Sequence, residues 1–285
     1  SALLPAPVDG VSLADKAEVS RILLGAGVEI NEMNAIRQQL SRVKGGGMAR
    51  LAAPAALRSY ILSDVIGDDL RAIASGPTVA PITTRAGAIA LLRAHGIFDA
   101  MPASVKTHLL SDASDFEPVE TQNTLIGSNR HSIEAMRHAS KDGILISDAL
   151  VGDVSDAARL ILDAAISNPS KTLLFGGETT VVLTGDGRGG RNQELALRVA
   201  VLAEGSDLGD WVFLSGGTDG RDGPTDAAGG IVDRGTLRRI RDAGHDPATL
   251  LANNDSYAAL AAAGDLLMSG ATGTNVADVQ VFIRR

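Results

Sequence analysis

The stretch TLLFGGETTVVLTGDGRGGRNQELAL, residues 172–197, contains in order two apolar runs, a glycine-rich loop and the start of a helical pattern. The runs Leu173–Phe175 and Val181–Leu183 are separated by GGETT, and a short glycine-containing connection of this kind predicts a β-hairpin. The periodicity that begins after Arg191 predicts a helix. The stretch therefore indicates an α/β structure whose sheet is mixed.

Strand-like and helical segments alternate on both sides of this stretch. Helical spacing of apolar side chains occurs in residues 14–25, 31–43, 83–95 and 154–167 and from Arg130 onward. Buried strands are predicted at Ser59–Asp64, 143–147 and Trp211–Ser215. The alternation favours an α/β architecture with parallel pairing, since parallel neighbours need crossover helices. The polar segment Ser111–Asn123 predicts a boundary between two domains, residues 1–118 and 119–285.

The composition limits the classes of function. At 285 residues, 45% of them hydrophobic, the chain suits one large or two ordinary domains. It has no cysteine, which excludes disulfides, a thiolate nucleophile and cysteine-bound metal centres. A net charge of −8 without a basic, aromatic-rich cluster argues against nucleic-acid binding. No apolar run approaches the ~20 residues of a membrane span. We expect a cytoplasmic protein that binds small molecules.

A glycine-rich loop with two arginines leads into the helix predicted after residue 190. Arg188, Gly189 and Gly190 belong to the loop, and Arg191 and Asn192 begin the helix. Free N–H groups and the positive end of a helix dipole favour an anion, and a guanidinium can fork onto phosphate or carboxylate. The spacing matches neither a P-loop nor a dinucleotide-binding motif. We predict an anion site, with a surface salt bridge of Arg191 as the alternative.

Acidic side chains follow several other predicted strands. Asp64, Asp68 and Asp69 come after the first strand and are followed by the turn Ser75-Gly76. Open α/β sheets place ligands at strand ends, although each acid could equally cap a turn or lie in a solvated loop. Carboxylates that hold Mg²⁺ beside an anion site are the parts that phosphoryl transfer needs. The pattern indicates a small-molecule kinase, with Mg²⁺ ligands among these three aspartates.

Six segments distributed over the chain share one family resemblance. They are LSRVKGG (40–46), ILSDVIGDD (61–69), IASGPTV (73–79), GGETTVVLTGDGRGGRNQELAL (176–197), SGGTDGRDGPTDAAGG (215–230) and GATGTNVADVQV (270–281). Together they resemble the bacterial and archaeal glycerate kinase family, whose members are also called hydroxypyruvate reductases. The resemblance implies ATP- and Mg²⁺-dependent phosphorylation of D-glycerate, commonly at the 2-hydroxyl.

The resemblance also implies an architecture and a set of site residues. It implies a cleft between a Rossmann-like N-terminal domain and a smaller α/β C-terminal domain, whose core at about residues 171–285 is similar to the MOFRL family. Asp64 and Arg191 match positions regarded as active-site residues. Candidate residues for binding substrate or nucleotide are Lys44, Ser75, Gly76, Glu178, Gly189, Gly190, Asn192, Asp219, Asp222 and Asp226.

The chain departs from the family pattern at its start. Family members continue upstream through a glycine-rich turn and a Gly-Lys-Ala segment whose lysine is thought catalytic. We therefore expect an incomplete Rossmann-like domain and impaired turnover by this chain alone. Two alternatives stay open: an NAD(P)H-dependent hydroxypyruvate reductase, although no dinucleotide-binding glycine motif is found, and a non-catalytic small-acid-binding module. A homodimer is compatible with each.

Overall fold

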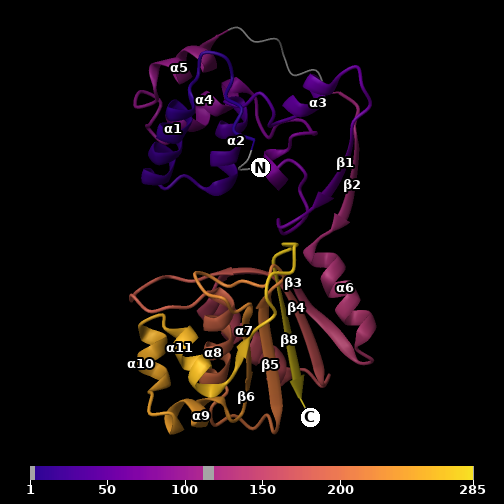
Figure 1. Ribbon diagram of the computed structural model, residues 1–285, viewed down its shortest axis with the longest axis vertical. Helices are drawn as coiled ribbons and strands as arrows, with labels where there is room; N and C mark the ends of the chain where they lie inside the picture. Colours follow the sequence, from indigo (N-terminus) through magenta and orange to yellow (C-terminus); the bar gives the residue numbers. More distant parts are fainter. Residues whose placement is uncertain (1–3, 112–118, 285) are drawn as a thin grey trace. The chain divides into compact units, whose positions relative to one another are not determined.

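The computed structural model describes residues 4–111 and 119–284. The chain divides into unit 1, Ser1–Ile61 with Asp68–Leu125, and unit 2, Leu62–Gly67 with Ile126–Arg285 (Figure 1). The expected boundary after residue 118 lies at the end of the segment 112–118, outside the described residues. Unit 2 is the longer unit in this chain because it contains the whole of a six-stranded sheet.

Unit 1 is built mainly from helices that pack on one another. Its helices are α1 (Leu13–Gly25), α2 (Ile30–Gln39), α3 (Gly47–Ala52), α4 (Arg85–Ala94), α5 (Ala103–Leu110) and the 3₁₀ helix Ile73–Ser75. A capping box fixes the start of α1, because the Ser12 hydroxyl accepts from the Asp15 N–H and the Asp15 carboxylate accepts from the Ser12 N–H. The apolar faces of α1, α2, α4 and α5 bury Val19, Leu23, Ile36, Leu92 and Val105.

The second predicted helix ends earlier than the periodicity indicated. It stops at Gln39 rather than at residue 43, and Gly45 and Gly46 follow with φ of 53° and 75°. These left-handed angles are incompatible with a continued right-handed helix and are tolerated by glycine. The segment therefore turns away as a loop.

The strands β1 (Arg58–Leu62) and β2 (Gln122–Gly127) form a two-stranded sheet. The Gln122 N–H donates to the Leu57 carbonyl near one end, and the Ser63 N–H donates to the Gly127 carbonyl near the other, so the strands run in the same direction. The prediction of a buried first strand was wrong, because Tyr60 is 69% exposed and a pair of strands covers no second face. Within the described residues, β1 and β2 form a sheet of their own, so the expected Rossmann-like sheet stays a prediction.

Unit 2 contains a mixed sheet, as predicted. Its order is β3-β4-β8-β5-β6-β7, with β3 (Gly143–Asp153), β4 (Thr172–Thr180), β5 (Trp211–Gly217), β6 (Gly229–Asp233), β7 (Leu266–Leu267) and β8 (Asp278–Arg284). The pair β3–β4 is parallel and the other pairs are antiparallel.

The predicted hairpin at GGETT is wrong, because β4 runs straight through these residues. The glycines serve a close approach instead of a turn. A side chain at Gly176 would collide with Asn129 and Ile133, and one at Gly177 would collide with the backbone of Leu150. The mixed sheet therefore arises without this hairpin: β8 inserts antiparallel between β4 and β5, and β6 and β7 extend the antiparallel part.

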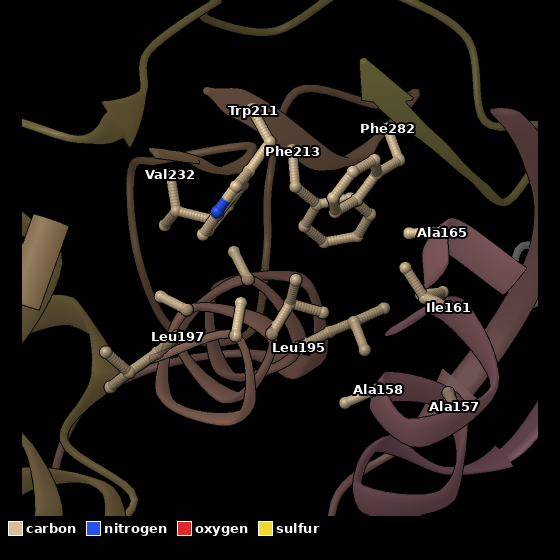
Figure 2. Packing of buried hydrophobic residues seen from close by; sticks show 14 of the residues in the cluster. Ala157, Ala158, Ile161, Ala165, Leu195, Leu197, Trp211, Phe213, Val232 and Phe282 are labelled. Atoms are coloured by element: carbon tan, nitrogen blue, oxygen red, sulfur yellow. The ribbon is translucent and has the colours of Figure 1, made fainter. Parts of the chain in front are cut away.

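Helices cover both faces of this sheet. They are α6 (Asn129–Ala139), α7 (Val154–Ser167), α8 (Arg191–Leu202), α9 (Thr236–Asp242), α10 (Pro247–Ala252) and α11 (Ser256–Ala263). Phe175 packs in the cluster with α7 and α8, whereas its neighbour Gly176 lies against α6, so α6 covers the opposite face. Figure 2 shows Trp211, Phe213 and Phe282 of the sheet above Leu195 of α8 and Ile161 of α7.

The aromatic side chains of this cluster are buried between the sheet and its helices. Phe175, Phe213 and Phe282 are completely buried, and the Phe282 ring stacks on Trp211 at 5.6 Å between centroids. Each buried phenyl ring contributes about 1.5–3 kcal/mol to stability.

None of the helices in the described residues combines the length and the apolar character that a bilayer crossing requires.

Candidate functional site

A cavity of about 610 Å³ lies in unit 2, at the end of β4 and the start of α8. Its polar lining includes Glu178 and Thr179 of β4, Arg191 of α8, and Asp222. The loops 189–190 and 223–224 and the side chain of Ile66 complete the wall. The Thr179 hydroxyl is buried and has no hydrogen-bond partner among the described residues. The cavity joins several sequence-predicted site residues.

Arg191 is the central cation of this cavity. Its Nε and Nη2 donate to the two carboxylate oxygens of Asp278, at 2.6 and 2.9 Å, and its Nη1 lies 3.0 Å from Oε1 of Glu178. Asp278 is completely buried, whereas the Arg191 side chain is 33% exposed. The surface salt bridge considered from the sequence is therefore incorrect, since one partner lies inside the fold. The guanidinium is held in a fixed plane at the cavity wall.

The pKa values of Arg191 and Glu178 are shifted by different causes. The hydrogen bonds from Arg191 to Asp278 raise the pKa of the guanidinium further above its usual value, which keeps it protonated. Burial raises the pKa of the Glu178 carboxyl, and the nearby charges of Asp278, Asp64 and Asp219 add to this, while Arg191 opposes it. Glu178 is thus a carboxyl group whose charged form is disfavoured beside a permanent cation.

The N-terminus of α8 is already capped by a carboxylate. Asp222 accepts from the backbone N–H groups of Asn192 (3.1 Å) and Gln193 (2.8 Å), and a side chain at Gly190 would collide with it. Burial raises the pKa of Asp222 and outweighs these hydrogen bonds. The predicted open anion site at this helix end is therefore wrong for the two N–H groups, because an internal anion occupies them. Asp222 acts here as a structural cap.

The four residues Arg191-Asn192-Gln193-Glu194 anchor four different parts of unit 2. Arg191 pairs with Asp278, as described above. The next residue, Asn192, accepts a hydrogen bond from the Ser215 hydroxyl of β5 at 2.6 Å. Gln193 donates to Asp222 and to Thr225 at 2.8 Å. Glu194 is 2% exposed and pairs with Arg198, and it also accepts from Asn254. The helix start is consequently locked to the strands and loops around the cavity.

The loop before α8 is held by residues that sequence reasoning missed. Asn254 accepts from the Thr184 and Gly185 N–H groups at 2.7 and 3.0 Å, and Asp255 accepts from the Arg188 N–H at 3.2 Å. The Gly187 N–H donates to the Asn253 carbonyl at 2.9 Å. The N–H groups of residues 184, 185, 187 and 188 are therefore used internally, whereas Gly189 and Gly190 line the cavity. The sequence signal was the polar run Asn253-Asn254-Asp255 before a helix, which is typical of capping.

The other acidic residues of unit 2 that the sequence analysis proposed for the site have different environments. Asp219 is half-buried and accepts from the Arg221 N–H at 2.9 Å. Asp226 is exposed and accepts from the Tyr257 hydroxyl at 2.8 Å. Asp64 is exposed, and its charge contributes to the raised pKa of Glu178. The charges of Asp64 and Asp219 thus both act on Glu178. Asp226 instead lies on the exposed surface of the loop.

In unit 1 the structure joins two of the predicted loops. The Gly45 N–H donates to the Ser75 carbonyl at 3.0 Å, the Gly46 N–H donates to the Gly76 carbonyl at 2.8 Å, and the Lys44 ammonium lies 3.4 Å from the Ser75 hydroxyl. Ser75 and Gly76 both have left-handed φ, 62° and 60°. Glycine adopts this angle freely, so the backbone strain lies at Ser75, and strain of this kind is typical of functional loops.

A preformed magnesium site is not found in the part of the chain that the structure describes, since no three carboxylates or histidines gather to hold a metal ion. Arg71 donates to both carboxylate oxygens of Asp69, at 3.0 and 2.9 Å. Asp68 has a left-handed φ of 56°. Asp64 is exposed and does not line the cavity, although its charge acts on Glu178. The sequence analysis did not consider this pair, although Arg71 lies two positions after Asp69.

Comparison with known proteins places this site in context. Residues 1–110 match the domain of unknown function DUF4147, and residues 171–278 match the MOFRL family. The chain is 40% identical to a D-glycerate 2-kinase of Thermotoga maritima, over 98% of this chain and 69% of that protein. It is also 40% identical to an Agrobacterium vitis protein that is named as a hydroxypyruvate reductase, over 99% of this chain and 67% of that protein.

A solved structure has the same fold. The crystal structure of a glycerate kinase from Thermotoga maritima matches with a TM-score of 0.88 at 38% identity, covering 98% of this chain and 69% of that chain.

Proposed function

Because the chain belongs to the glycerate kinase family, we propose that it transfers a phosphoryl group from ATP to the 2-hydroxyl of D-glycerate. The observation that carries the proposal is the guanidinium of Arg191, held by the buried Asp278 at the wall of the cavity and 3.0 Å from Glu178. A fixed cation beside a carboxyl group supplies the charge stabilisation and the proton acceptor that the reaction needs.

Arg191 has the role of stabilising charge on the transferred group. Two of its nitrogens are used by Asp278, and Nη1 is directed at Glu178. An anionic oxygen of glycerate or of the phosphoryl group competes with Glu178 for this third nitrogen. Because Asp278 already fixes the plane of the guanidinium, little reorganisation is required when charge develops.

The proton of the glycerate hydroxyl needs an acceptor. As the hydroxyl oxygen bonds to the γ-phosphorus and the bond to the β-phosphate oxygen breaks, the proton moves to a carboxylate. Asp64 is the acceptor indicated by the sequence, and Glu178 is the acceptor favoured by its raised pKa, since a carboxyl with a pKa nearer neutrality is the better base. Matched Asp64→Asn and Glu178→Gln variants discriminate between them.

ATP and Mg²⁺ are proposed as the co-substrate and its metal. A kinase that has no three-ligand metal cluster among its described residues is expected to receive Mg²⁺ with the nucleotide phosphates, in contact with one or two carboxylates at most. Asp64 is our candidate ligand. Asp68 and Asp69 are weaker candidates, since Asp69 is already paired with Arg71. Lys44, Ser75 and Gly76 stay our candidates for binding substrate or nucleotide in unit 1.

The alternative reaction is reduction of hydroxypyruvate. It is favoured by the name of the Agrobacterium vitis relative. It requires a dinucleotide cradle, and the N–H groups of Gly185, Gly187 and Arg188 in the glycine loop are donated to Asn254, Asn253 and Asp255 instead. A non-catalytic acid-binding module is the third alternative, and it predicts glycerate binding without turnover.

The decisive experiment is incubation of the protein with ATP, Mg²⁺ and D-glycerate, followed by ³¹P NMR of the product. We expect a phosphate monoester coupled to the C2 proton. A parallel reaction with NADH and hydroxypyruvate should leave NADH unchanged. Oxidation of NADH without any phosphate ester would replace the kinase proposal by the reductase, and glycerate binding without either product would support the binding module.

A further inference from the structure

Two loops that form part of the wall of the unit 2 cavity contact each other through their backbones. Gly189 and Gly190 line the cavity from one loop, and Gly223 and Pro224 line it from the other. A side chain at Gly223, whose φ is 60°, would collide with the Gly189 carbonyl, so the two backbones approach closely. Because a glycine buries no side chain, the position of this wall depends on contacts that its neighbours in the chain make.

One such contact is the stack of the Arg188 guanidinium on the Tyr257 ring. The central carbon of the guanidinium lies 4.5 Å from the ring centroid, within the range of a cation–π interaction. Nε of Arg188 donates to the Pro224 carbonyl at 3.3 Å. The Tyr257 N–H donates to the Arg188 carbonyl at 2.9 Å. Arg188 therefore joins both loops of the wall to the start of α11.

Asp226 ties the second loop to the same ring. Its Oδ1 accepts from the Tyr257 hydroxyl at 2.8 Å, two positions after Pro224. This hydrogen bond lowers the pKa of the Asp226 carboxyl, and the positive charge of Arg188 acts in the same direction, so the carboxylate stays charged. The three side chains thus interact as one group. We call Arg188, Tyr257 and Asp226 the outer cluster.

We propose that the outer cluster positions the wall of the unit 2 cavity, with Tyr257 as its central positioning residue. The side chains of Arg188, Tyr257 and Asp226 do not line the cavity, so they act on a ligand through the loops 189–190 and 223–224. Tyr257 is central because its ring contacts Arg188 and its hydroxyl bonds to Asp226. A wall that is already ordered costs less conformational entropy when a ligand binds. The inference rests on the proposed function only where turnover is measured.

Hydrogen exchange of the protein without any ligand tests the positioning directly. Tyr257→Ala removes both side-chain contacts, so exchange at residues 187–190 and 222–228 should become about fivefold faster or more. Tyr257→Phe keeps the ring and loses the hydroxyl. It should therefore restore the slower exchange at residues 187–190 and leave exchange at residues 222–228 fast.

Arg188→Ala has a matched control elsewhere in the chain. Arg93 lies over the Phe98 ring at 5.2 Å in unit 1, outside the lining of the cavity, so Arg93→Ala removes a contact of the same kind. Arg188→Ala should speed exchange at both loops, whereas Arg93→Ala should leave their rates within about twofold of the wild type. The double variant of Arg188→Ala and Tyr257→Ala should exchange within about twofold of Tyr257→Ala, because the two side chains share one contact.

Steady-state kinetics shows whether the wall acts on the bound substrate. A wall that binds the ground state and the transition state alike changes KM more than kcat. We expect KM of Tyr257→Ala to rise about threefold or more, with kcat within about twofold of the wild type, and Arg93→Ala to change neither. A fall in kcat with an unchanged KM, as a loss of folded protein produces, would overturn the positioning role.

The exchange measurement separates failure of this inference from failure of the proposed function. Unchanged exchange at both loops in Tyr257→Ala and Arg188→Ala would overturn the inference even in a protein that phosphorylates glycerate. Faster exchange in these variants would support it even in a protein that does not. Arg188→Ala and Tyr257→Phe decide the matter if Tyr257→Ala does not fold.

Discussion

The guanidinium of Arg191 and the carboxylate of Asp278 form a two-pronged ion pair, with contacts of 2.6 and 2.9 Å, in which Asp278 is completely buried. The two residues lie on α8 and β8, 87 positions apart in the chain. The pair therefore ties the start of the helix to the centre of the sheet. The Nη1 atom of Arg191 takes no part in this pair and lies beside Glu178 at the cavity.

Asp278→Asn tests whether this pair positions Arg191. The amide keeps the shape but offers one acceptor, so we expect stability to fall by about 1–3 kcal/mol and kcat/KM to fall about tenfold or more. Urea denaturation and steady-state kinetics measure the two effects. Asp265→Asn is the control, because Asp265 forms a similar pair with Arg239 at 2.7 Å outside the cavity lining. It should lower stability alone, and an equal loss of activity in both variants would contradict the positioning role.

Arg191→Lys separates charge from geometry. Lysine keeps the charge and reaches one oxygen of Asp278 rather than two, so the transition state is stabilised less accurately. We expect kcat/KM to fall on the order of a hundredfold, or about 2–4 kcal/mol. Arg191→Ala should in addition lower Tm, since Asp278 is left buried without its partner. Kinetics beside thermal melts measure both, and near-wild-type kcat/KM in both variants would remove Arg191 from the mechanism.

Glu178→Gln should change the pH dependence of stability. Burial, with the neighbouring carboxylates, raises the pKa of Glu178 in the folded state, so the folded protein holds this proton more tightly than the unfolded chain. The stabilising contribution is complete below the unfolded pKa and is lost as pH rises through the folded pKa. The variant should therefore gain Tm relative to the wild type at about pH 8 and lose that gain at about pH 4. A gain that is larger at the lower pH would contradict the assigned direction.

Asp64→Asn and Glu178→Gln should affect catalysis differently. Loss of the proton acceptor is expected to lower kcat about 10²–10⁴-fold. Loss of a metal ligand is expected to raise the Mg²⁺ concentration needed for half-maximal rate, with recovery at high Mg²⁺. We expect the first result for Glu178→Gln and the second for Asp64→Asn. Rate measurements across a Mg²⁺ series decide this, and the exchanged pattern would make Asp64 the base.

Asn254→Ala should loosen the glycine loop before α8. Asn254 is 3% exposed, accepts from two N–H groups of the loop, donates to Glu194, and has φ of 55°. Alanine leaves these groups unpaired and is disfavoured at this φ, so we expect a loss of about 2–4 kcal/mol. Hydrogen exchange at residues 184–188 should become faster. Asn253→Ala is the control, because the Asn253 side chain accepts one long bond of 3.3 Å and should cost less.

Local sequence patterns were sufficient for much of the secondary structure. The helical spacing at residues 154–167 coincides with α7, and the helix predicted after Arg191 is α8. The apolar run Trp211–Ser215 lies within β5. These elements were predictable because the periodicity of buried side chains within one element reports directly which of its faces is covered.

Only the tertiary structure decided which residues contact one another. The GGETT segment has the composition of a turn, but the approach of Asn129, Ile133 and Leu150 requires glycines in a continuous strand. Asp222 caps a helix that begins 31 positions earlier, at Arg191, and Asp278 reaches Arg191 from a strand that inserts between two others. The sequence by itself therefore determined several of the helices and strands, such as α7, α8 and β5, and which residue types could bind an anion. Which carboxylate meets which cation depended on the order of strands in the sheet, because that order places residues far apart in the chain within hydrogen-bonding distance.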